Sequence, residues 1–358
     1  GGSSGNGRGR HDPNETRTAR ETSRRCDLRR EYQLGYTKGN IMKILYCDEI
    51  KTIVRGLDLL PLIKKGFVAY SEGRSVVPPV GELSFNDPPG DVHIKYGYIT
   101  GDEFYVIKIA SGFWNNEHLG IPNGQGMMLL FKQQTGQCEA ILLDDAYLTD
   151  VRTAVAGAIC AELFANEVNC IGVLGTGLQA RMQVQYLKNI TSCHKVLVWG
   201  RNRKKMEIYQ KDMARLGFQV DLSSAPKEVA KECNLIITTT ASTVPLLSSI
   251  NIQPGTHITA MGSDTLTKQE LEVDILSMAD LVVADSIAQC KERGEIFHGL
   301  TSGSITEDEI VELGSILNGS QAGRSSLDQI TVADLTGVAV QDIQIAAAVH
   351  KAYKENNK

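Results

Sequence analysis

The glycine loop IGVLGTGLQA, at residues 171–180, constrains the fold more than any other stretch of this sequence. Gly175, Gly177 and Ala180 have G-x-G-x-x-A spacing, directly after a β-rich run and directly before a helical pattern. In that context the first glycine permits a tight turn, the second lets the backbone approach a pyrophosphate, and the third small residue lets helix and strand pack closely. The stretch predicts a dinucleotide-binding turn, with an ordinary strand-to-helix turn as the alternative. Its residues are Gly175, Thr176, Gly177, Leu178, Gln179 and Ala180.

Around this loop the chain alternates short β-rich runs with helical ones from residue 169 onward. The β-rich runs include KVLVW, LIITTT, HITAMG and LVVADS. Such alternation is typical of a parallel sheet with helices on both faces. We therefore predict an α/β fold with a doubly wound, Rossmann-type domain over residues 156–325.

The region before the loop has another pattern. The runs DVHIKYGYI, FYVIKIAS, GMMLLFKQ and CEAILLDD are joined by Gly, Asn and Pro residues, which is typical of a mixed or antiparallel sheet. FYVIKIAS is apolar on both alternating faces, so we expect this strand to be covered on both sides. The run GVAVQDIQIAAAVHKAYKEN predicts an amphipathic helix that returns to this second, mixed α+β domain.

Composition excludes several functional classes. The net charge of −5 argues against nucleic acid as a partner, and no apolar run approaches the about 20 residues of a membrane helix. The eight cysteines lack zinc-site spacing, so we expect free thiols and no metal. Residues 1–40, rich in Gly, Ser and Arg, predict a disordered extension. We expect a cytoplasmic protein, with organellar import through this extension as the alternative.

The residues after the second strand of the Rossmann-type domain bear on the choice of dinucleotide. NAD sites usually carry an acid there, whereas KVLVWG is followed here by Arg201, Asn202 and Arg203. Guanidinium groups suit a 2′-phosphate, so we expect NADP(H) to be favoured over NAD(H). A solvated basic helix start is the alternative.

Asp264 follows the strand-like run HITAMG, which in a parallel sheet places it at the carboxyl edge, where ligands bind. Thr267 and Glu270 have the T-x-x-E spacing of a capping box, which predicts a helix that begins after Asp264. We therefore expect Asp264 to have a functional role rather than to cap a helix.

Two cations occupy positions that are unfavourable for a charge. Lys108 lies in the apolar run FYVIKIAS, where it needs an anionic partner or a cavity, and a structural salt bridge is an equal alternative. Arg152 follows Thr149 and Asp150, either of which we predict to be a helix N-cap. The helix dipole disfavours a cation in that first turn, so Arg152 is a candidate carboxylate clamp, with an ordinary surface arginine as the alternative.

The order of these motifs, from about residue 42 to 353, resembles the ornithine cyclodeaminase/mu-crystallin family. The matching stretches are VIKIASG, LLDDAYLTDVRTAVAGA, IGVLGTGLQAR, IITTTAS, PGTHITAMGSDTLTKQEL and DLTGVAVQD. The resemblance implies a usually dimeric protein in which residues 41–155 and 326–358 together build a substrate-binding and dimerisation domain. It also implies hydride transfer, with NAD(P), at the carbon that bears nitrogen in an amino acid or imino acid.

The resemblance assigns roles to individual residues. Lys108 and Arg152 match cations that bind the substrate carboxylate, and Asp264 matches the catalytic acid/base; we place Lys108 with Asp264 in the catalytic group. Further residues match the cofactor pocket: Thr153, Thr239, Thr240, Ala241, Met261, Gly262, Thr336 and Gly337.

The sequence departs from the ornithine enzymes upstream of Lys108, where those enzymes carry an arginine and then a glutamate. Glu82, His93 and Lys95 are the substrate-binding candidates here, and a glutamate for a distal ammonium group is not evident. His93 and Lys95 share a strand face, for which a solvated surface is the expected explanation. We favour an oxidoreductase of an amino acid/imino acid pair over an ornithine cyclodeaminase. A mu-crystallin-like NADPH-binding protein is a third hypothesis, which Asp264 disfavours.

Overall fold

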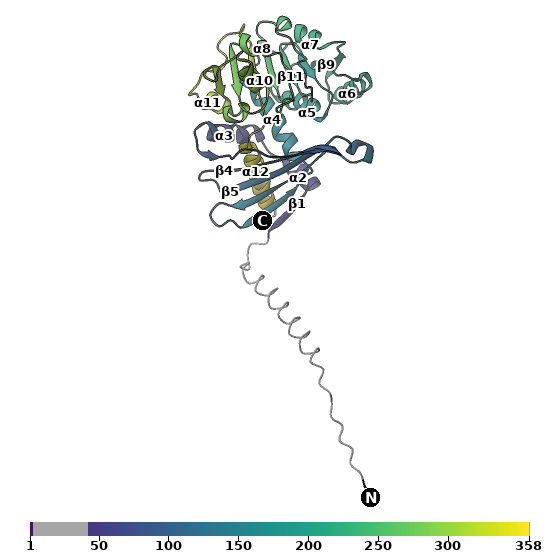
Figure 1. The fold of residues 1–358 in the computed structure, drawn as a ribbon, viewed down its shortest axis with the longest axis vertical. Helices are drawn as coiled ribbons and strands as arrows, with labels where there is room; N and C mark the ends of the chain where they lie inside the picture. The colour runs from purple at the N-terminus through teal and green to yellow at the C-terminus, as the bar shows by residue number, and fades with distance from the viewer. Residues whose placement is uncertain (3–41, 358) are drawn as a thin grey trace. The chain divides into compact units, whose positions relative to one another are not determined.

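The computed structural model describes residues 1–2 and 42–357, and Ile44–Lys358 form one compact unit (Figure 1). The predicted disordered extension lies outside the described residues, apart from its first two. The division into residues 41–155 with 326–358 and residues 156–325 stays a prediction. Among the helices of the described residues, none has the length and apolarity needed to cross a membrane.

The glycine loop belongs to an eight-stranded sheet with the order β10-β9-β8-β11-β12-β15-β13-β14, in which all neighbouring strands are parallel. Its strands are β8 (Ile171–Leu174), β9 (Lys195–Trp199), β10 (Gln219–Leu222), β11 (Leu235–Thr238), β12 (His257–Ala260), β13 (Leu281–Ala284), β14 (Ile310–Glu312) and β15 (Thr331–Asp334). Five of them are buried along their whole length, as expected of strands covered on both faces. This parallel sheet confirms the predicted Rossmann-type fold.

Helices and short turns connect these strands. They are α5 (Leu178–Tyr186), η2 (Leu187–Asn189), α6 (Arg203–Arg215), α7 (Pro226–Glu232), η3 (Ser249–Asn251), α8 (Val273–Met278), α9 (Ile287–Cys290), α10 (Glu295–Ser302), η4 (Glu307–Glu309) and α11 (Leu313–Leu317). Strands β14 and β15 were not predicted, and β15 lies between β12 and β13, although it is the last strand in the chain. Residues at the ends of β12, β13 and β15 therefore meet at one edge of the sheet.

A second, seven-stranded sheet has the order β1-β7-β6-β5-β4-β2, with β3 also paired to β4. Its strands are β1 (Lys43–Tyr46), β2 (Ser75–Val76), β3 (Gly81–Asn86), β4 (Pro89–Ile99), β5 (Phe104–Phe113), β6 (Gly124–Lys132) and β7 (Cys138–Leu143), and the short turn η1 (Asn116–Leu119) follows β5. Strands β2 to β7 pair antiparallel, as predicted. One face is buried and the other is partly exposed, because Val106 and Lys108 point inward whereas Ile107 points outward.

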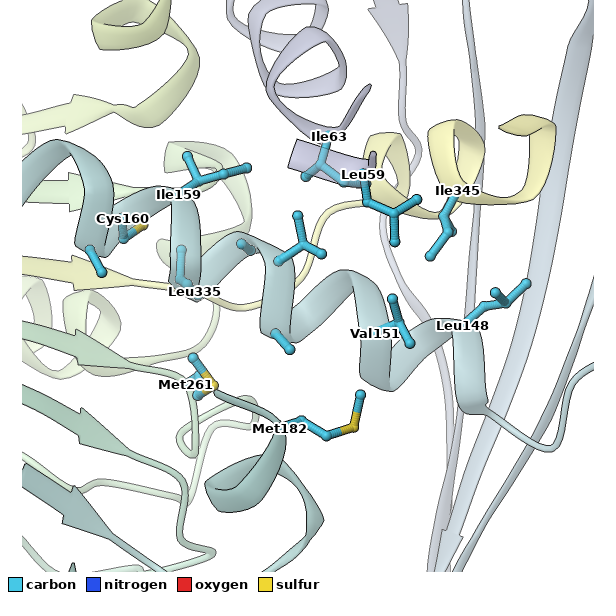
Figure 2. Packing of buried hydrophobic residues seen from close by; sticks show 14 of the residues in the cluster. Leu59, Ile63, Leu148, Val151, Ile159, Cys160, Met182, Met261, Leu335 and Ile345 are labelled. Carbon is cyan, nitrogen blue, oxygen red and sulfur yellow. The ribbon is translucent and has the colours of Figure 1, made fainter. Parts of the chain in front are cut away.

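Four helices accompany this second sheet: α2 (Cys47–Val54), α3 (Leu59–Ser71), α4 (Tyr147–Phe164) and α12 (Ala339–Asn356). As predicted, the C-terminal helix α12 returns to it and contacts β4, β5, α3 and α4. Figure 2 shows α4 running through the main apolar core, with Leu148 and Val151 near Ile345 of α12 and Ile159 and Cys160 farther along the helix. Helix α4 thus shares one core with both sheets.

Candidate active site

The predicted glycine loop is formed between β8 and α5. Gly175 has a φ of +118°, and a Cβ atom there would overlap Thr239 Oγ1, so glycine is required. Gly177 is different, because a Cβ atom there would meet no protein atom within 4 Å. Ala180 is buried and packs the helix against the strand. The open space beside Gly177, at the N-terminus of a nine-residue helix, fits the close approach of a pyrophosphate.

A cleft of about 540 Å³ extends from this loop. Its lining residues are Gly175, Thr176, Trp199, Gly200, Arg201, Asn202, Lys205, Thr239, Thr240, Ala241, Ser242 and Leu246. Asn202 also caps α6, since its side chain accepts a hydrogen bond from the backbone N–H of Lys205. Arg203 does not line the cleft; its Nε donates to Glu207 Oε1 at 3.2 Å. The remaining residues of the predicted turn flank the cleft: Leu178 is exposed, and the Gln179 side chain donates to Asp150.

The loops after β11 and β12 are joined by a buried acid. Glu270 accepts hydrogen bonds from the backbone N–H groups of Thr240, at 2.6 Å, and Gly262, at 2.9 Å, and Met261 beside them is buried. The predicted capping box at Thr267 and Glu270 is therefore wrong. The carboxylate of Glu270 is used by the two loops, and helix α8 begins later, at Val273.

Three cations gather on the buried side of the second sheet. Lys95 in β4 and Lys108 in β5 are directly opposite each other, and Arg152 reaches them from α4. Lys108 Nζ lies 3.2 Å from Asp342 Oδ2, and Arg152 Nε donates to Asp342 Oδ1 at 3.1 Å. Lys108, Arg152 and Asp342 are at most 5% exposed. Arg152 is therefore not a surface residue. Lys108 has the expected salt bridge, to Asp342, within this buried cluster, and its opening onto a cavity stays a prediction.

The start of α4 differs from the prediction. The helix begins at Tyr147 after Ala146, which has a φ of +65°, and Asp144 accepts a hydrogen bond from the backbone N–H of Leu148. Arg152 therefore lies in the second turn, not the first, so the helix dipole does not explain its place. Its position instead lets the side chain reach α12. The hydroxyl group of Thr153, the next residue, donates to the carbonyl of Thr149. The backbone carbonyl of Thr153 accepts from the Gln183 side chain.

Burial lowers the pKa of both lysines. Burial, followed by the charges of Lys108 and Arg152, lowers the pKa of Lys95 to about 7. Burial also lowers the pKa of Lys108 to about 8, against the opposing charge of Asp342. Both groups therefore titrate near neutral pH, and an added anion would favour their charged forms.

Thr336 and Gly337, predicted near the cofactor, bind Lys95 through their carbonyl groups. Lys95 Nζ donates to Thr336 O at 2.9 Å and to Gly337 O at 2.5 Å. Asp285, at the end of β13, accepts from Thr336 Oγ1 and the N–H of Gly337. Gly337 has a φ of +80°, and a Cβ atom there would lie 2.5 Å from Arg152 Nη1. The loop after β15 thus links the edge of the parallel sheet to the cations.

Asp264 lies in the loop after β12, at the predicted carboxyl edge. Lys268 Nζ donates to Asp264 Oδ1 at 2.5 Å, and the Asp264 side chain is 40% exposed. Burial would raise the pKa of Asp264, but Lys268, His93 and Lys95 outweigh it, and the net direction is downward. Asp264 is therefore an ionised carboxylate that reaches solvent beside the cation cluster.

His93 and Glu82 are directly opposite each other on β4 and β3. His93 Nε2 lies 3.8 Å from Glu82 Oε1, and Arg293 Nη2 lies 3.4 Å from Glu82 Oε2. The expected solvated face is wrong, because Lys95 is buried and the His93 side chain is 15% exposed. Burial and then Lys95 lower the pKa of His93. Glu82 also lines a cleft of about 790 Å³, whose wall includes Asp91, Trp114, Lys268 and Arg293.

The residues that sequence reasoning missed are the buried carboxylates Asp342 and Asp285 and the guanidinium of Arg293, and it assigned Glu270 a different role. A signal existed for Asp342, a lone charge in the apolar run VAVQDIQIAAAV and a suitable partner for Lys108. Within residues 1–2 and 42–357, no three His, Cys, Asp or Glu side chains gather as a metal site requires. The seven described cysteines are free thiols.

A family model covers nearly the whole described chain. The ornithine cyclodeaminase/mu-crystallin model matches residues 41–357. This chain belongs to the ornithine cyclodeaminase/mu-crystallin family. An uncharacterized cyclodeaminase of Sinorhizobium fredii is 36% identical over 321 residues, which span 88% of this chain and 97% of the relative.

Solved structures of this family share the fold. An archaeal alanine dehydrogenase dimer with bound NAD is 28% identical, with a TM-score of 0.81 over 88% of this chain and 97% of that one. The iminosuccinate reductase of Paracoccus denitrificans, in complex with NAD⁺, is 26% identical, with a TM-score of 0.78 and the same coverage of both chains. The family and the α/β fold predicted from sequence are thus confirmed, and proteins similar to this chain bind NAD.

Proposed function

We propose that the protein is an NAD(P)-dependent oxidoreductase that acts at the C–N centre of an amino acid/imino acid pair. The observation that carries this proposal is the buried group of Lys95, Lys108 and Arg152, for which Asp342 is the one carboxylate in direct contact among the described residues. A buried excess of positive charge is costly, and a substrate carboxylate would offset it. Lys95 of this group helps to lower the pKa of Asp264, and it binds the loop after β15 at the edge of the parallel sheet.

Each part of the site has a task in this proposal. Lys95, Lys108 and Arg152 would hold the substrate by its carboxylate and so restrict its orientation. Asp264, ionised at neutral pH, would accept a proton from the substrate nitrogen in the oxidative direction and return it in the reductive direction. The glycine loop and the cleft beside it would hold a nicotinamide cofactor, which supplies or accepts the hydride when bound.

Two other functions remain as alternatives. Ornithine cyclodeamination would need an anion for the distal ammonium group, and Glu82 is the candidate from sequence. Arg293 and His93 near its carboxylate weaken that role. A mu-crystallin-like NADPH-binding protein would need no acid/base, whereas Asp264 lies beside the cation cluster. We also propose NADP(H) as the favoured cofactor, with NAD(H) as the alternative, and a homodimer.

The test is an assay of the purified protein with NADPH or NADH, 2-oxo acids, and ammonia or methylamine, beside ornithine with NAD. We expect oxidation of the reduced cofactor with at least one 2-oxo acid. Proline and ammonia from ornithine, without net cofactor change, would replace the proposal with the cyclodeaminase. Tight NADPH binding without turnover of any panel member would favour the binding protein.

Asp264→Asn tests the acid/base assignment. Loss of a positioned general base typically costs about 10²- to 10⁴-fold in rate, so kcat should fall within that range. The dissociation constant for the cofactor should stay near its wild-type value, since Asp264 does not line the cleft at the glycine loop. Asp274→Asn, an exposed residue of α8, is the control and should leave both quantities unchanged. Wild-type turnover of Asp264→Asn would remove this residue from the mechanism.

A further inference from the structure

Asp342 occupies a central place in the cation cluster. It lies on the first turn of α12, is 1% exposed, and uses one carboxylate oxygen for each of two cations. Oδ1 accepts from Arg152 Nε at 3.1 Å, and Oδ2 lies 3.2 Å from Lys108 Nζ. One buried side chain of α12 therefore connects β5 with α4.

The contacts of Asp342 leave donors of both cations for another anion. Arg152 uses Nε on Asp342 and Nη1 on Gln341 Oε1, at 2.9 Å, while its Nη2 has no hydrogen bond to any of the described residues. An ammonium group carries three N–H donors, so Lys108 also keeps donors beyond its contact with Asp342. Asp342 and Gln341 thus fix Nε and Nη1 of the guanidinium group and leave Nη2 for a ligand.

We propose that Asp342 is a positioning residue that holds Lys108 and Arg152 together as one receptor for the substrate carboxylate. This inference rests on the proposed function, because it assigns the receptor to that substrate. Two buried cations repel each other, and a carboxylate between them lets both keep their charge and direction. Without it, Lys108 would face Lys95 and Arg152 with Asp144 as its remaining acidic neighbour.

Loss of Asp342 should therefore make carboxylate binding more sensitive to alkaline pH. Burial already lowers the pKa of Lys108 to about 8, and Asp342 opposes that shift. In Asp342→Asn the pKa of Lys108 should fall further, so its ammonium group would lose its proton at a lower pH. Carboxylate affinity would then decline from a lower pH than in the wild type, because a neutral lysine no longer attracts the anion.

The experiment compares the wild type, Asp342→Asn, Asp342→Glu and the control Glu139→Gln, all as full chains. Glu139 is a second buried carboxylate that holds α12, through His350 and Lys354, away from the cation cluster. The KM for the 2-oxo acid that turns over best is measured from pH 6 to pH 9, with pyruvate as the reference probe. The ε-carbon resonance of Lys108 is titrated by NMR in ¹³C-lysine-labelled protein and assigned with Lys108→Met.

For Asp342→Asn we expect a KM about tenfold or more above the wild type at pH 8, a smaller change in kcat, and an alkaline rise of KM at lower pH. The NMR midpoint of Lys108 should move in the same direction. Asp342→Glu keeps the charge, so the alkaline rise of KM should stay near the wild-type pH. Its longer side chain should displace the two cations and so raise KM. Glu139→Gln should lower stability while both pH profiles stay unchanged.

An unchanged NMR midpoint together with an unchanged KM profile in Asp342→Asn would overturn the proposal. If Asp342→Asn does not fold, the KM of Asp342→Glu tests the proposal instead. A KM equal to that of the wild type would then overturn the proposal. A wild type that turns over no 2-oxo acid contradicts the proposed function instead. In that case the Lys108 midpoint, with and without pyruvate, still decides whether Asp342 maintains an anion receptor.

Discussion

Arg201 and Arg203 follow the same strand, β9, but the structure gives them different surroundings. Arg201 lines the cleft beside the glycine loop, whereas Arg203 pairs with Glu207 on the same helix. We expect Arg201→Ala to raise the dissociation constant for NADPH about tenfold, through the loss of a charged contact to the 2′-phosphate, and to change that for NADH little. Arg203→Ala is the matched control. Equal effects of Arg201→Ala on NADPH and NADH, measured by calorimetry, would rule out the phosphate contact.

At the residue scale, sequence reasoning identified the cations but not what holds them. Lys108 and Arg152 were predicted because charge is costly in an apolar run or at a helix start. Their shared partner Asp342 lies 190 residues from Arg152 in the chain, and no local pattern connects them. The position of Arg152 was also misjudged by one turn, because Ala146 adopts a left-handed conformation that the sequence did not indicate. Contacts between residues that are far apart in the sequence can be identified only from the folded structure.

At the element scale, the segment from Gly262 to Glu272 shows why a helix start was predicted wrongly. Its T-x-x-E spacing is typical of a capping box, yet Glu270 binds the backbone of Thr240 in the loop after β11 and that of Gly262 in its own segment. Glu295, the first residue of α10, in turn accepts from the N–H groups of Glu270 and Leu271. Strands of four or five apolar residues were predictable because burial on both faces dictates their composition. Hydrogen bonds that join loops follow no such sequence pattern, so they could not be predicted.

From the burial of Glu270 and Glu295 we predict that the stability of the fold depends on pH. Burial raises the pKa of Glu270 to about 7 and that of Glu295 to about 8. A raised folded-state pKa means that the native protein binds more protons than the unfolded chain above the ordinary glutamate range. The free energy of unfolding should therefore fall as pH rises from 5 to 8, by up to about 1.4 kcal/mol per pH unit for each extra proton.

Glu270→Gln should flatten this decline, since the amide does not titrate. The measurement is urea denaturation of the wild type and the variant at several pH values between 5 and 8. Glu49→Gln, an exposed residue of α2, is the control and should keep the wild-type slope. A slope in Glu270→Gln that equals that of the wild type would show that other groups set the pH dependence.

At the scale of the whole molecule, the outer face of the antiparallel sheet is unusually apolar for a surface. Strand register places Tyr96, Ile107, Leu129 and Ile141 in one row across four strands. In the same face Tyr105 and Phe131 stack with their ring centroids 4.9 Å apart. The sequence predicted that β5 is covered on both sides, whereas within one chain its outer residues are partly exposed. A second copy of the chain would complete that cover.

We therefore expect Ile107→Asp to convert a wild-type dimer into a monomer, because the new carboxylate would lose water in an apolar interface without a partner. Sedimentation equilibrium measures the mass of each species, and circular dichroism verifies that the variant is folded. Ile208→Asp, an exposed position on α6, adds the same charge elsewhere and should leave the dimer intact. If Ile107→Asp stays dimeric, another surface joins the subunits. The archaeal alanine dehydrogenase with this fold is a dimer, which supports the expectation for the wild type. If the wild type is monomeric, the apolar row needs a different explanation.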